Sequence, residues 1–127
     1  MKTSKDPRHI DRIKAMQELF AWDFNPVKSV GSVRSVKSVE EIIKHIKKID
    51  KKIEEAAPTW PISKINKIDL AILRLATYEL LVESKVPTKV AVDEAVELAK
   101  EYGADASASF VNRALGKLIE VNQIKVD

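Results

Sequence analysis

The sequence predicts an all-α fold, a compact bundle of about five to six helices that forms one domain over residues 1–127. Apolar residues recur at intervals of three and four in several segments, which is the spacing of an amphipathic helix. No segment alternates between apolar and polar residues as a strand would, and no internal repeat of about 20 to 50 residues is present. With 127 residues, 45% hydrophobic and 32% charged, the chain is long enough to bury one core.

The first helix is expected from Pro7 to about Phe24, with the Asp6 carboxylate as its N-cap. Its apolar stripe consists of Ile10, Ile13, Met16, Phe20 and Phe24. Its other side carries Arg8, His9, Arg12 and Lys14. These cations lie near the N-terminal end, where the helix dipole disfavours them, so an anionic partner or simple solvation explains them about equally well.

Residues 27–38 are expected to be a low-complexity connector. Valine recurs at every third residue and serine keeps step with it, and a period of three fits neither a helix nor a strand. A mobile or extended segment is therefore predicted, and a basic arm that touches nucleic acid is the alternative.

A capping box of Ser38 and Glu41 opens the next predicted helix, which Pro58 stops. Its outer side carries Lys44, Lys47, Lys48, Lys51 and Lys52. Without interleaved aromatic residues, these lysines indicate a solvated face rather than a phosphate-binding one. Trp60, between two prolines, is expected to clamp two helices from a turn.

Residues 67–84 are apolar nearly all round, which is typical of a central helix covered on most sides. Asp69, Arg74 and Glu79 interrupt this pattern. Arg74 and Glu79 are five residues apart, so they are not neighbours along one helix. They are expected to find partners on other helices, on the backbone or on another protein.

Two further helices are expected, one between Pro87 and Gly103 and one over about 107–121. The inward residues of the first are Val92, Ala95, Val96, Ala99 and Tyr102. Its outer side is an acidic ridge of Asp93, Glu94, Glu97 and Glu101. In the last helix Phe110 faces inward, whereas Asn112, Arg113 and Lys117 face outward.

The formal net charge of +3 is confined to residues 1–14, and the remaining chain is neutral. The first 14 residues hold Lys2, Lys5, Arg8, Arg12 and Lys14 against Asp6 and Asp11. This location indicates an anionic partner held at one end of the molecule.

Several function classes are excluded by missing residue types. Cysteine is absent, which excludes disulfides, thiolate nucleophiles and thiolate-bound metals. His9 and His45 are too far apart for a helical metal-ligand pair, and three scattered glycines form no phosphate-binding loop. No apolar run reaches the roughly 18 residues of a membrane span. We therefore expect a cytoplasmic protein that is not an enzyme, with no cofactor, no metal and no membrane association.

Five segments, taken in order, resemble the NusB family of bacterial transcription antitermination factors. They are residues 8–22 (RHIDRIKAMQELFAW), 59–65 (TWPISKI), 68–80 (IDLAILRLATYEL), 86–103 (VPTKVAVDEAVELAKEYG) and 109–118 (SFVNRALGKL). The resemblance implies an all-helical RNA-binding protein that recognises the single-stranded boxA element of nascent ribosomal RNA together with NusE, a small-subunit ribosomal protein. The pair would then act on elongating RNA polymerase to suppress termination, so contact with the polymerase complex would be indirect.

The resemblance also assigns roles to individual positions. The residues that the resemblance implies face the RNA are Arg8, His9, Arg12, Phe110 and Asn112, and we expect the nearby cations Lys5, Arg113 and Lys117 to join them. The implied NusE-facing residues are Phe20, Asp69, Tyr78 and Glu79. Capping of a neighbouring helix by Glu79 is an equally good interpretation. A homodimer is a further option, because some members of the family dimerise.

The chain departs from the family pattern near its last helix. Arg113 stands where the family commonly has glycine, and this cation could strengthen phosphate binding or obstruct it. Gly116 is expected to interrupt the helix. Two alternative functions stay open: the RNA-binding front module of a ribosomal RNA cytosine methyltransferase, and a protein-only adaptor that binds NusE but not RNA.

Overall fold

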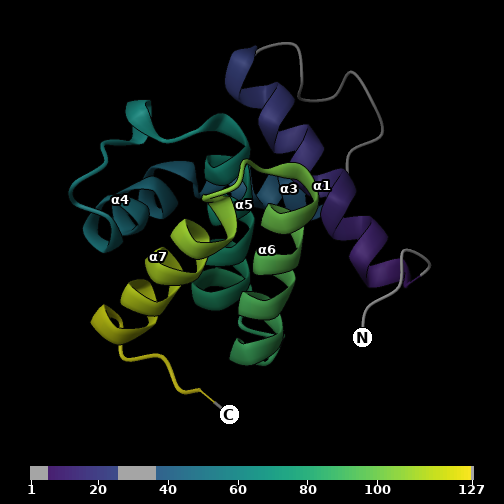
Figure 1. Cartoon of the computed structure of the whole chain (residues 1–127). Coiled ribbons are helices and arrows are strands. Elements are labelled where there is room, and N and C mark those ends of the chain that lie inside the picture. The colour runs from purple at the N-terminus through teal and green to yellow at the C-terminus, as the bar shows by residue number, and fades with distance from the viewer. Residues whose placement is uncertain (1–5, 26–36, 127) are drawn as a thin grey trace.

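The computed structural model describes residues 6–25 and 37–126, and its regular structure within them is entirely helical (Figure 1). In chain order the elements are α1 (Pro7–Phe24), α3 (Lys37–Lys44), α4 (Ile46–Ala56), the 3-10 turn η1 (Ile62–Lys64), α5 (Lys67–Thr77), the π-helix η2 (Tyr78–Glu83), α6 (Thr88–Tyr102) and α7 (Ser107–Val121). The predicted all-α class is confirmed. Most of the expected connector lies outside the described residues, but Lys37 and Ser38 belong to α3.

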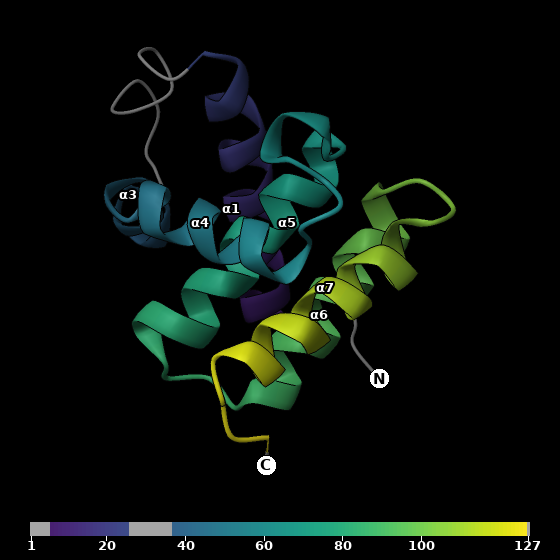
Figure 2. The same cartoon turned by 90° about the vertical axis from the view of Figure 1, so that its left-hand side faces the viewer.

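The central helix is α5, which packs against α1, α4, α6 and α7 (Figures 1 and 2). Every residue from Asp69 to Leu80 is buried, as the nearly continuous apolar sequence predicts. The surrounding helices each contribute fully buried side chains to the same core, among them Leu19, Ile53, Leu98 and Leu115. None of the described helices combines the length and the apolar character needed to cross a membrane.

Arg74 joins three helices around this core. Its side chain is only 5% exposed, and its Nε and Nη2 lie 2.9 and 2.8 Å from the two carboxylate oxygens of Asp50 on α4. Its Nη1 lies 3.0 Å from Asp23 Oδ1 on α1, and its guanidinium carbon lies 5.5 Å from the centre of the Trp22 ring. The prediction that Arg74 finds partners on other helices is confirmed.

Helix α1 begins at Pro7 with Asp6 as its N-cap, as expected. The Asp6 carboxylate accepts a hydrogen bond from the Arg8 N–H at 2.9 Å. The next predicted helix, by contrast, is divided at His45 into α3 and α4. His45 Nδ1 lies 2.9 Å from the Glu41 carbonyl oxygen, which also accepts the His45 backbone N–H. The His45 N–H also lies 3.1 Å from the Ile42 carbonyl oxygen three residues back, so the chain is wound more tightly at this turn. The capping-box prediction is wrong, because α3 already includes Ser38, whereas the stop before Pro58 is confirmed.

The predicted helix over 67–84 changes its winding at Tyr78, where η2 follows α5. The Ser84 N–H donates to the Glu79 carbonyl at 3.1 Å, a bond between residues five apart, and Ser84 takes a left-handed φ of 54°. Periodicity does not distinguish one π turn from an α turn, because both leave the same apolar residues buried.

The bounds of α6 and α7 agree with the expected ones, but three details differ. Gly116 does not interrupt α7, because a single glycine costs a helix only about 1 kcal/mol and the flanking Leu115 and Leu118 are held in the core. Tyr102 is 40% exposed rather than inward. Glu94 is 2% exposed rather than part of an outer ridge, because α1 covers it.

Candidate nucleic-acid interface

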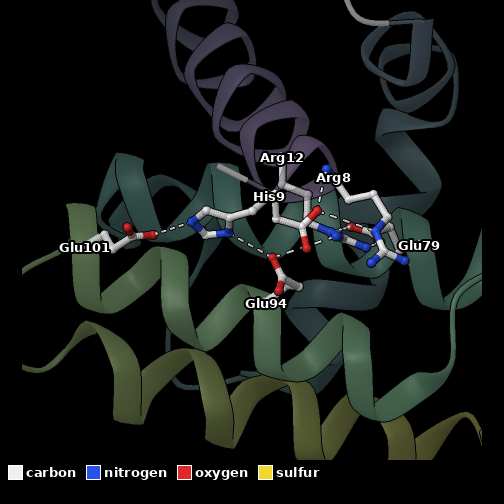
Figure 3. A network of polar contacts seen from close by, with 7 residues as sticks. Arg8, His9, Arg12, Glu79, Glu94 and Glu101 are labelled. Atoms are coloured by element: carbon white, nitrogen blue, oxygen red, sulfur yellow. Dashed lines mark hydrogen bonds and ion pairs between the residues drawn. The ribbon is translucent and has the colours of Figure 1, made fainter. Parts of the chain in front are cut away.

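The basic end of α1 is tied to α6 and η2 by a polar network (Figure 3). His9 is 4% exposed, with Nδ1 3.0 Å from Glu94 Oε1 and Nε2 2.9 Å from Glu101 Oε1. Both ring nitrogens are therefore engaged inside the protein. The expectation that His9 lies on the outer side of the first helix is wrong, because α6 packs on that side and supplies two carboxylates.

Arg12 forms a two-pronged contact with Glu79. Its Nε lies 3.1 Å from Glu79 Oε2 and its Nη2 lies 2.7 Å from Oε1, while Nη1 lies 3.7 Å from Glu94 Oε1. The Arg12 side chain is 12% exposed and that of Glu79 8%. Glu79 thus has its partner on another helix, one of the alternatives left open by the sequence. Paired carboxylate and guanidinium groups at this depth hold α1 against η2 and α6.

Arg8 is the predicted RNA-facing residue at this end that reaches solvent. Its side chain is 84% exposed, with Nε 3.6 Å from Asp6 Oδ1. The Arg8 backbone N–H and then its guanidinium charge lower the pKa of Asp6. Lys5, the other candidate here, lies outside the described residues. Arg8 is therefore the described cation of the predicted set that is best placed at this end to meet a phosphate.

A second surface, which we name the α7 groove, is defined by Trp60, Phe110, Arg113 and Lys117. It is a hollow of about 480 Å³ between residues 56–60 and α7. Trp60 is 50% exposed, Phe110 is half-buried, and Arg113 and Lys117 are exposed. Lys117 Nζ also lies 3.1 Å from Glu120 Oε1, but both side chains are open to water, so this pair is weak. Aromatic faces beside cations suit single-stranded nucleic acid, in which bases stack and phosphates pair.

Asn112 lies apart from the α7 groove. It lines a different hollow with Asp93, Glu97 and Lys100 of α6 and Ser109. Residues two apart on a helix point about 200° apart, so Phe110 and Asn112 face opposite sides of α7. The structure therefore distributes the predicted RNA-facing residues over three places: the α1 end, the α7 groove and the α6–α7 side.

The four predicted NusE-facing residues are largely covered. Asp69, Tyr78 and Glu79 are 6, 7 and 6% exposed, and Phe20 is half-buried with its ring edge-on to Phe24 at 4.9 Å between centres. Burial, followed by the nearby Glu83 carboxylate, raises the pKa of Tyr78. Tyr78 and Glu79 line a hollow of about 260 Å³.

Sequence reasoning missed two features of the site. Trp60 was expected to clamp helices, yet it stands half-exposed beside Phe110 and Arg113. Its place between two prolines was the available signal, since such a ring is held in a turn at the surface. The pairing of His9 with two glutamates on α6 had no sequence signal, because the residues are 85 and 92 positions apart. Among residues 6–25 and 37–126, no three potential ligands gather closely enough for a metal ion.

Comparison with known proteins gives consistent matches. The sequence model of the NusB family matches residues 23–120. A relative from Lachnoclostridium phytofermentans, the transcription antitermination protein NusB, is 50% identical over 68 residues, which cover 54% of this chain and 52% of that protein. The matched part thus spans about half the length of that relative.

Two solved structures share the fold. NusB of T. maritima superposes with a TM-score of 0.74 at 31% identity, over 94% of this chain and 93% of that chain. A crystal structure of the antitermination factors NusB and NusE in complex with dsRNA gives a TM-score of 0.74 at 22% identity, over 90% of this chain and 96% of that chain. The family match over residues 23–120 and the likeness to T. maritima NusB show that this chain belongs to the NusB family.

Proposed function

We propose that this chain is a transcription antitermination factor that binds the single-stranded boxA element of ribosomal RNA transcripts together with NusE. The α7 groove is the observation that carries the proposal, because it combines two aromatic rings with two cations on an exposed surface. Support comes from the relatives, which are named antitermination proteins, and from the related complex that contains NusE and RNA. The role is non-enzymatic, and the bound pair acts on elongating RNA polymerase.

Within this proposal the exposed cations, the aromatic rings and the buried basic residues have different tasks. Arg8, Arg113 and Lys117 are exposed and supply phosphate contacts, while Phe110 and Trp60 stack on bases. His9 and Arg12 act indirectly, by fixing the end of α1 that carries Arg8. NusE extends the RNA-binding surface, so RNA affinity is expected to rise when it is present.

The test is a boxA mobility shift with and without NusE at two salt concentrations. Replacing Arg113 and Lys117 by alanine is expected to weaken binding and to flatten the slope of log K against log salt by about 0.7 for each lost phosphate contact. Lys48→Ala is the control, because it removes an exposed lysine of α4 that lines none of the hollows beside α7.

An unchanged titration in the double variant would remove the α7 groove from the site. An equal loss in Lys48→Ala would move the RNA to the lysine face of α4. Capture of NusE without any shift of boxA would favour the protein-only adaptor instead.

A further inference from the structure

The N-terminal half of α7 borders a second hollow beside the α7 groove. It has a volume of about 360 Å³, within the range of about 300 to 1,000 Å³ common for small-molecule sites. Trp60, Phe110 and Arg113 line both hollows. The second hollow alone adds Lys64, Ile65, Asn66, Asp69, Ala104, Ala106 and Ser107.

Asp69 is the unusual member of this lining. The residue is 6% exposed, and its Oδ1 is buried without any hydrogen-bond partner in the structure. Burial raises the pKa of Asp69, and the neighbouring Ser107 hydroxyl only partly offsets that effect. A buried hydrogen-bond acceptor without a donor destabilises the protein. Such an atom in a native structure therefore indicates that a ligand or a water molecule supplies the donor.

The rest of the lining defines the chemistry of that ligand. Trp60 and Phe110 offer flat aromatic surfaces, and Lys64 and Arg113 are exposed cations of the same hollow. Asp69 is the single carboxylate in the lining, which is too few for a divalent cation that prefers several oxygen ligands. The complementary molecule has a planar face, an N–H donor and a negative charge, which together describe a nucleotide.

Building on the proposed function, we infer that this hollow takes one unstacked base of the bound RNA and that Asp69 accepts a hydrogen bond from the N–H edge of that base. Guanine fits best, because its ring N–H and its amino group are adjacent donors that face a carboxylate together. Uracil fits worst, because its ring N–H lies between two carbonyl oxygens that the carboxylate repels. Asp69 is thus a base-selecting residue, and the cations bind the flanking phosphates.

The inference is tested by fluorescence anisotropy with the full chain and two labelled 12-nucleotide RNAs, oligouridine and the same oligomer with one central guanosine. The wild-type protein is expected to bind the guanosine oligomer several-fold more tightly. Asp69→Asn is expected to bring this ratio close to one while leaving oligouridine affinity within about twofold. Trp60→Ala is expected to weaken both RNAs by about fivefold or more, because a stacking surface is lost.

Asp105→Asn is the matched control. It also removes one negative charge beside α7, but Asp105 is exposed and lines neither hollow. The ratio of the affinities for the two RNAs is therefore expected to stay at the wild-type value. An inosine oligomer, which lacks the 2-amino group, is expected to bind between the other two.

The outcomes separate this inference from the proposed function. If the wild-type protein binds both RNAs and Asp69→Asn keeps the preference for guanosine, the base pocket is refuted and RNA binding stands. If the wild-type protein binds neither RNA, nor boxA with NusE, both ideas fail. Thermal unfolding of each variant is measured alongside, and Asp69→Asn is expected to be at least as stable as the wild type at pH 7, since it removes a buried charge.

Discussion

Two glycines near α7 have contrasting surroundings. A Cβ built on Gly103 would lie 2.5 Å from both Cβ and Oγ of Ser107 and 2.7 Å from the Ala99 carbonyl oxygen. The Ser107 hydroxyl cannot simply turn away, because it accepts the Ala104 N–H at 2.9 Å and thereby forms the turn into α7. Gly116, by contrast, has nothing within 4 Å of such a Cβ. Only the first glycine is required by close packing.

Alanine at these two positions is therefore expected to change stability in opposite directions. Gly103→Ala should cost about 1 to 3 kcal/mol, because the neighbours must shift to admit the methyl group. Gly116→Ala should add about 0.5 to 1 kcal/mol, because alanine is the better helix former at an open site. Urea unfolding measures both variants. A loss of stability in Gly116→Ala would show that the α7 backbone is not regular there.

At the scale of elements, the contacts of Arg12 and His9 join α1 to η2 and α6. The network holds three glutamates, of which Glu79 and Glu94 are nearly inaccessible to solvent. Removing a cation from such a cluster leaves carboxylates buried without compensation, which is far more destabilising than losing a surface pair. Residues that look like an RNA-binding run in the sequence therefore differ sharply in what they contribute to folding.

Arg12→Ala is expected to lower the free energy of unfolding by about 3 to 5 kcal/mol, whereas Arg8→Ala should change it by no more than about 0.5 kcal/mol. Urea unfolding of both variants checks this difference. If Arg12→Ala were as stable as Arg8→Ala, the network would not support the α1 end. A loss of RNA binding in Arg12→Ala has to be judged against its folded fraction.

The contact between α1, α4 and α5 at Arg74 has a pH dependence that follows from Asp23. Burial tends to raise the pKa of Asp23, but hydrogen bonds and charge from Lys67 and Arg74 outweigh it and lower the pKa below its usual value. A carboxylate with a lowered folded-state pKa stabilises the protein above its unfolded pKa of about 3.9. That stabilisation is lost as the pH falls through the folded-state pKa.

Asp23→Asn is accordingly expected to be less stable than the wild type at pH 7, with the difference shrinking once the pH falls below about 4. Chemical unfolding at pH 7, 5, 4 and 3 gives the comparison. A difference that stayed constant with pH would mean that the shape of Asp23, and not its charge, matters at this joint. Asp105→Asn, at an exposed position, is the reference variant.

At the scale of the whole molecule, α6 lies between α1 and α7, so it separates Arg8 from the α7 groove (Figures 1 and 3). The hollow that contains Asn112 lies on the α6–α7 side. An RNA that contacts both Arg8 and Arg113 has to extend across this part of the surface. The arrangement predicts a long strand with separated contacts rather than one compact site.

Arg8→Ala and Arg113→Ala are therefore expected to have additive effects on the binding free energy of a long boxA RNA, within about 0.5 kcal/mol. The double variant and both single variants, titrated at one salt concentration, give the coupling. An oligomer shortened from one end should lose sensitivity to one of the two substitutions. If each substitution abolished the effect of the other, the contacts would belong to a single site.

Much of the fold follows from the sequence because helix periodicity and helix ends are local properties. The Asp6–Pro7 start of α1, the stop before Pro58 and the bounds of α6 and α7 depend on residues within a few positions of each other. The division at His45 and the π turn at Tyr78 were missed, because each depends on one side chain or one hydrogen bond that leaves the apolar pattern unchanged.

The candidate site was predictable only in part. The resemblance to the NusB family led to the prediction that Arg8, Phe110, Arg113 and Lys117 face the RNA together with His9 and Arg12. It does not indicate which basic side chains pair inside the protein, because the partners Glu79, Glu94 and Glu101 lie 67 to 92 positions away.

The sequence by itself thus determined the helical class, the order of the helices and the central place of the segment 67–84, since local periodicity and composition are sufficient for these. Only the tertiary structure decided that His9 and Arg12 are structural contacts, that Trp60 and Phe110 line the same two hollows, and that Asp69 in the second of these keeps a buried oxygen without a partner. The physical reason is that charge pairing and burial depend on distances in space between residues that are remote along the chain.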